Sequence, residues 1–120
     1  MSDKMLEMTI DELCYESNKT ARDKGFWDDP NPNFGEKVAL IHSELSEALE
    51  EVRSGGLEAG NMIFFKPDNP DKPEGVAVEL ADALIRLGDL CWQYDIPLLK
   101  ATRLKMAFNK TRPRKHWREF

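Results

Sequence analysis

Apolar residues recur with the period of an α-helix between residues 76 and 92, and they fall on two sides of that helix. One side carries Val76, Leu80, Ala83, Leu87 and Leu90, and the nearly opposite side carries Val78, Ile85 and Trp92. A helix that is apolar on two sides is expected to be buried. The polar positions form one narrow strip, which consists of Glu79, Asp82, Arg86 and Asp89.

Three further segments show helical signals. Thr9 and Glu12 form a capping-box pattern that predicts a helix over residues 10–24, which Gly25 ends. Asn33 and Glu36 start a second helix that runs to about residue 54, with a core stripe of Val38, Ile41, Leu45, Ala48, Leu49 and Val52. The last helix is predicted from a cap at Asp95 to an end near Pro113. Its inward residues are expected to be Leu98, Leu99, Ala101, Leu104 and Phe108.

The connections between these helices are of two kinds. Pro30 and Pro32 exclude regular structure from the segment that carries Phe26 and Trp27, so these aromatic residues are placed on a loop. Residues 55–74 are rich in glycine and proline and predict a long loop without a convincing strand. The expected fold is therefore all-α, a four-helix bundle that forms a single domain over residues 1–120.

The amino-acid composition argues against two classes of binding partner. The formal charge is −5, which argues against binding to a nucleic acid polymer or an anionic membrane surface. No apolar run is long enough to span a membrane and no signal peptide is recognised, so a cytoplasmic protein is expected. Cys14 and Cys91 belong to no metal-binding or redox spacing and are predicted to be reduced thiols in the core.

Two pairs of carboxylates carry the candidate chemistry. Glu44 and Glu47 lie three positions apart beside the core stripe of the second helix, and Glu79 and Asp82 do so on the most apolar helix. A single pair of this kind is usually a solvated helix face, but packing the two helices together would bring all four acids into one site. Clustered carboxylates require a compensating cation, and all-oxygen ligands favour Mg²⁺ or Mn²⁺. The sequence therefore predicts a divalent-metal site.

These acids also carry a family resemblance. E-L-S-E at residues 44–47 and E-L-A-D at residues 79–82 resemble the E-x-x-E and E-x-x-D signature of the MazG-like, all-α nucleoside triphosphate pyrophosphatases. The phrase N-K-T-R-P-R-K-H near the end is similar to members of the same family, and the resemblance covers roughly residues 35–116. It departs from some relatives at Ser43, where they carry an additional glutamate.

The resemblance implies an activity and a set of roles. It implies that Glu44, Glu47, Glu79 and Asp82 are the catalytic acids and the Mg²⁺ ligands, with Mn²⁺ as a substitute, and that one of them helps to activate a water molecule. The reaction would split a nucleoside triphosphate, usually a deoxynucleotide, between the α- and β-phosphates. The products would be the monophosphate and pyrophosphate.

Further residues are candidates for substrate binding. Phosphate contacts are expected from Lys105, Asn109, Arg112 and Lys115, for which an ordinary solvated helix face is an equal alternative. Base contacts are expected from Phe26, Trp27 and His42, although loop aromatics more often cover a core.

The second apolar stripe, with Val78, Ile85 and Trp92, predicts a homo-oligomer, because four short helices cannot easily cover both sides of one helix. The resemblance adds that relatives are dimers or tetramers. Two alternative functions stay open: a phosphoribosyl-ATP pyrophosphohydrolase, which shares the acid pattern, and a catalytically silent helical bundle that serves dimerisation or regulation.

Overall fold

The computed structural model describes residues 7–114, which form four helices and one β-hairpin. The elements in chain order are α2 (Ile10–Asp23), α3 (Phe34–Arg53), β1 (Phe64–Lys66), β2 (Asn69–Glu74), α4 (Val76–Gln93) and α5 (Leu98–Thr111). The mostly helical class is as predicted. Over the same residues, none of the helices combines the length and the hydropathy that crossing a membrane would require.

The helix starts follow the capping signals in the sequence at two of the three predicted positions. Thr9 Oγ1 accepts a hydrogen bond from the Glu12 amide at 3.1 Å, and Asn33 Oδ1 accepts one from the Glu36 amide at 3.0 Å. The predicted cap at Asp95 is wrong. Asp95 lies in a turn with a positive φ of 53°, and α5 starts after Pro97 without a side-chain cap.

The core lies where α4 packs against α2 on one side and α3 on the other. Buried apolar residues come from all three helices: Cys14 and Ala21, Ala48, and Val76, Ala83, Leu90 and Cys91. Gly88 allows α2 to approach α4 closely, because a Cβ there would lie 2.7 Å from Leu13 Cδ2. Cys14 and Cys91 are buried and unpaired, as predicted, and burial raises the pKa of both thiols.

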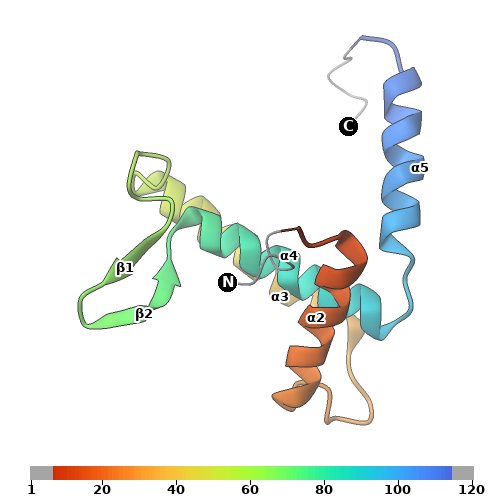
Figure 1. Cartoon of the computed structure of the whole chain (residues 1–120), viewed down its shortest axis with the longest axis horizontal. Helices are drawn as coiled ribbons and strands as arrows, with labels where there is room; N and C mark the ends of the chain where they lie inside the picture. The colour runs from red at the N-terminus through yellow and green to blue at the C-terminus, as the bar shows by residue number, and fades with distance from the viewer. Residues whose placement is uncertain (1–6, 115–120) are drawn as a thin grey trace.

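The segment between α3 and α4 forms a β-hairpin that was not predicted from the sequence. β1 and β2 pair antiparallel, with Phe64 opposite Glu74 and Lys66 opposite Asn69, so the prediction of a loop without strands is wrong here. Pro70 and Pro73 are tolerated because each strand of a two-stranded hairpin has an unpaired edge. Gly75, with φ of 115°, connects the hairpin to α4. Figure 1 shows the hairpin projecting from the helices at the end opposite α5.

Helix α5 stands apart from the other helices. It touches α2, has no buried residue, and rises away from α3 and α4 (Figure 1). The radius of gyration is 16.9 Å, against about 13 to 14 Å for a compact domain of this length. Leu104 and Phe108 were predicted to face inward, yet they are 64% and 55% exposed because nothing in the described chain covers this helix face. One chain alone therefore does not form a closed four-helix bundle.

Candidate metal centre and adjoining cavity

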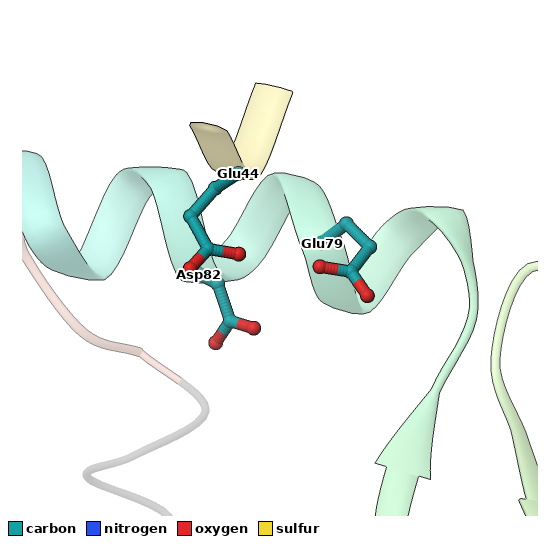
Figure 2. A group of neighbouring side chains, drawn as sticks. All are labelled: Glu44, Glu79 and Asp82. Atoms are coloured by element: carbon teal, nitrogen blue, oxygen red, sulfur yellow. The ribbon is translucent and has the colours of Figure 1, made fainter. Parts of the chain in front are cut away.

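Three of the four predicted acids converge where α3 crosses α4. Figure 2 shows Glu44 reaching from α3 toward Asp82 on α4, with Glu79 one turn nearer the start of α4. One carboxylate oxygen from each of the three lies within 4.8 Å of the others, and all three residues are partly buried. The helical period explains this convergence, since Glu79 and Asp82 are three positions apart and share one face of α4.

Glu47 stands beside this group rather than in it. Its side chain is exposed on α3 and lies close enough to that of Glu79 for the two carboxyl groups to share a proton. The structure thus brings all four predicted acids into one neighbourhood, but it separates a group of three from a fourth residue that contacts it through Glu79.

Burial and mutual repulsion change the protonation of this group. Burial, followed by the interaction with Glu47 and the charges of Glu47, Glu44 and Asp82, raises the pKa of Glu79 to about 7. Burial also raises the pKa of Asp82, and the charge of Glu44 adds to this, whereas Arg86 opposes it. The cluster therefore holds more negative charge than its environment compensates, and a divalent cation would relieve this imbalance.

The raised pKa of Glu79 predicts how the stability of the metal-free protein depends on pH. Because the folded pKa of about 7 exceeds the unfolded value of 4.5, the folded state loses stability as pH rises through this interval. In the presence of EDTA, urea unfolding should give a lower free energy of unfolding at about pH 8 than at about pH 5.5.

Glu79→Gln should reduce that difference in stability, because glutamine does not titrate. Glu50→Gln, on the exposed side of α3, is the matched control and should keep the wild-type pH dependence. An unchanged pH dependence in Glu79→Gln would show that Glu79 titrates normally.

Arg86 supplies a positive charge beside the acids, and no role was predicted for it from the sequence. Its Nε donates a hydrogen bond to Glu44 Oε1 at 3.0 Å, and the Glu44 side chain is only 13% exposed. The signal was present in the sequence, because Arg86 is one turn beyond Asp82 on the same polar strip of α4. The acid cluster thus carries its own positive neighbour, which is placed to contact an anionic ligand.

A cavity of about 580 Å³ opens directly beside the acids, between α2 and α4. Its walls are mainly apolar and include Leu13, Ala21, Phe26, Leu84 and Ile85. Its polar lining includes Glu44, Asp82, Arg86 and Asp89. Both the volume and the mixture of apolar walls with a few polar groups are typical of a small-molecule site.

The three predicted base-binding residues lie in different surroundings. Phe26 is 66% exposed and lines this cavity. Trp27 lines a smaller cavity of about 240 Å³, with Lys37 Nζ 4.4 Å from its ring centroid and its indole N–H donating to Asp89. His42 is exposed on α3 and belongs to the lining of neither cavity.

Within residues 7–114, the predicted phosphate-binding residues of α5 do not reach the acids of the same chain. Lys105 and Asn109 are exposed on α5, which leads away from the first turns of α4, where Glu79 and Asp82 lie (Figure 1). Lys105 Nζ and Arg112 Cζ lie 5.0 and 5.7 Å from the centroid of the Phe108 ring. Lys115 lies outside the described residues.

Comparison of the chain with protein-family models, with curated proteins and with solved structures finds no match. The family resemblance therefore rests on the sequence motifs alone.

Proposed function

We propose that this protein is a divalent-metal-dependent nucleoside triphosphate pyrophosphohydrolase of the MazG-like type, acting on a deoxynucleoside triphosphate. The observation that carries the proposal is the convergence of Glu44 with Glu79 and Asp82 beside an apolar cavity. Carboxylate oxygens from two helices suit Mg²⁺ or Mn²⁺, and a cavity of this size suits the nucleoside part of such a substrate.

The donor set fits a hard divalent cation. Glu44, Glu79 and Asp82 would hold it, and the raised pKa values of Glu79 and Asp82 indicate surplus negative charge for it to balance. When bound, such an ion neutralises phosphate charge and lowers the pKa of a coordinated water.

Other residues of the chain are assigned to proton transfer and to substrate binding. Glu47 lies outside the group of three and contacts Glu79, so we assign to it the acceptance of a proton from the attacking water. Arg86 lies next to Glu44 and is assigned to the phosphate chain, where a guanidinium compensates the charge on phosphate oxygens. Leu84 and Ile85 are assigned to the apolar wall of the cavity that contacts the nucleoside.

We further propose that the partner of this chain is a second copy of it. Helix α5 carries Lys100, Arg103, Lys105 and Lys110 without an acidic residue, whereas α3 carries Glu36, Glu44, Glu47, Glu50 and Glu51 against two basic residues. Both helices also expose apolar side chains, including Leu45 and Leu49 on α3 and Leu104 and Phe108 on α5. Laying α5 of one copy against α3 of another matches charge and covers apolar surface. It also brings the predicted phosphate-binding residues toward the partner's acids, in a dimer or a tetramer.

Product analysis tests the proposed reaction. The protein is incubated with Mg²⁺ and each ribo- and deoxynucleoside triphosphate, and separately with phosphoribosyl-ATP, and the products are separated by ion-exchange chromatography. We expect nucleoside monophosphate and pyrophosphate in equal amounts, because the proposed attack falls between the α- and β-phosphates. Orthophosphate as the primary product would overturn the proposal. Turnover of phosphoribosyl-ATP alone would support the related pyrophosphohydrolase, and no turnover of any substrate would favour the silent bundle.

A further inference from the structure

A polar network fixes one carboxylate at the far end of the large cavity. Asn18 is only 2% exposed, and its Nδ2 donates to Asp89 Oδ1 and to Gln93 Oε1, both at 2.9 Å. Trp27 Nε1 also donates to Asp89 Oδ1, at 2.8 Å. Arg22 Nε completes the network by donating to Gln93 Oε1 at 3.1 Å. Donors from α2 and from the following loop thus hold two side chains of α4 in fixed positions.

The network uses only one of the two oxygens of Asp89. Within residues 7–114, both hydrogen bonds to this carboxylate end on Oδ1. Oδ2 keeps its lone pairs for another donor, and Asp89 lines both the large cavity and the smaller one beside Trp27. A carboxylate held in this way has a defined direction before a ligand arrives, so little conformational entropy is lost on binding.

The negative charge of the cavity lining determines which kind of ligand group can lie against Asp89. Among residues 7–114, Glu16, Glu44, Asp82 and Asp89 line it against one cation, Arg86, and Lys37 lies in the lining of the smaller cavity that Asp89 also borders. An anionic group would be repelled at the Asp89 end, whereas a neutral group with N–H donors would be attracted. Asp89 lies seven residues beyond Asp82 on α4, which is two turns or about 10 Å along the helix. The metal centre and Asp89 therefore mark the two ends of one elongated site.

We infer that Asp89 is a specificity-determining residue that accepts a hydrogen bond from the exocyclic amino group of the substrate's base. This inference rests on the proposed function, which places the phosphates at the acids and the base in the cavity. It favours cytosine and adenine nucleotides over uracil and thymine nucleotides. A carbonyl oxygen at the same position would face the Asp89 carboxylate without a proton between them, and a buried unpaired polar contact is costly.

The decisive comparison is between dCTP and dUTP, whose bases differ in the amino and carbonyl groups at one ring position and the proton on the adjacent ring nitrogen. We expect kcat/KM for dCTP to exceed that for dUTP by roughly 10- to 100-fold, the range for a hydrogen bond to a charged group. Asp89→Asn should reduce this ratio at least tenfold. Asparagine has the same shape, its oxygen can keep the bonds from Asn18 and Trp27, and its NH₂ group would then face the base as a donor. Assaying dATP and dTTP in parallel separates a preference for cytosine from a preference for any amino-bearing base.

Two controls isolate the role of Asp89. Asp28→Asn removes an exposed carboxylate from the loop that carries Trp27 and should leave the ratio of dCTP to dUTP unchanged. Trp27→Phe removes one donor to Asp89 Oδ1 and should reduce the ratio less than Asp89→Asn does, which provides a second test should Asp89→Asn fold poorly.

A binding readout separates this inference from the proposed function. Isothermal titration calorimetry with dCMP and dUMP, without metal, should show tighter binding of dCMP to the wild type and a loss of that difference in Asp89→Asn. If the protein binds dCMP more tightly than dUMP but hydrolyses no triphosphate, the result supports the contact between Asp89 and the base and contradicts the proposed reaction. Equal affinities for dCMP and dUMP, or an unchanged ratio in Asp89→Asn, would overturn the inference.

Discussion

Glu79→Gln and Asp82→Asn should each abolish metal-dependent turnover while the protein keeps its helical content. Each substitution removes one ligand charge from a group whose three oxygens lie within 4.8 Å of one another. Losing the metal forfeits several kcal/mol of transition-state stabilisation, so we expect kcat/KM to fall on the order of 10³-fold or more. Mn²⁺ binding, measured by electron paramagnetic resonance, should weaken in parallel. Circular dichroism checks that the helices are intact.

Glu47→Gln tests whether Glu47 is a metal ligand or a general base that accepts a proton from the attacking water. Because Glu47 contacts the group of three through Glu79, we expect this variant to bind Mn²⁺ almost as tightly as the wild type. Its kcat should nevertheless fall by roughly 10²- to 10⁴-fold, the usual contribution of a general base. Glu50→Gln on the same helix is the control and should leave both quantities unchanged. Full activity in Glu79→Gln or Asp82→Asn would rule out the proposed metal centre.

Local signals in the sequence predicted most of the helical structure. The caps at Thr9 and Asn33 are satisfied by bonds within three residues of the chain, so they depend little on tertiary structure. The hairpin was missed because its strands are short and β2 contains two prolines, which normally argue against a strand. Asp95 was misread because it ends α4 rather than starting α5. It takes the positive φ that glycine usually supplies after a helix, and the Asp95 and Ile96 amides donate to the Trp92 and Cys91 carbonyls.

The candidate site was predictable in part. The spacing of Glu44, Glu79 and Asp82 indicated that they would share a site, since their positions follow from helix periodicity and from the packing of α3 on α4. The Asn18–Asp89 contact was not predictable, because it joins residues 71 positions apart and neither carries a recognisable motif. The placement of Lys105 and Asn109 was also beyond a sequence reading, because it depends on where α5 packs.

The protein should be a homo-oligomer in solution, and disrupting the exposed face of α5 should break it. Leu104, Met106 and Phe108 are 55% to 64% exposed on α5, and Ile85 and Trp92 are 46% and 42% exposed on α4. Leaving large apolar side chains in water forgoes roughly 1.5 to 3 kcal/mol for each one relative to full burial. Size-exclusion chromatography with light scattering should therefore give at least twice the chain mass of 13.8 kDa.

Paired substitutions test which faces are covered. Leu104→Glu with Phe108→Glu should lower the measured mass toward that of one chain, because charges would be buried in an apolar contact. Ile85→Glu with Trp92→Glu should do the same or unfold the protein. Asn31→Glu, in the exposed loop between α2 and α3, adds a negative charge elsewhere and should leave the mass unchanged.

Mixing two impaired variants tests whether a second copy completes the site. Asp82→Asn lacks the metal centre, and Lys105→Ala lacks one predicted phosphate contact on α5. In the proposed dimer, α5 of one copy contacts the phosphates bound at the acids of the other copy. Random mixing makes about half of the dimers mixed, and each mixed dimer has one of its two sites intact. Remixing should therefore restore about a quarter of wild-type activity. Two copies of either variant alone should stay impaired, which serves as the internal control. A stable and fully active monomer of 13.8 kDa at micromolar concentration would show that one chain carries the whole site.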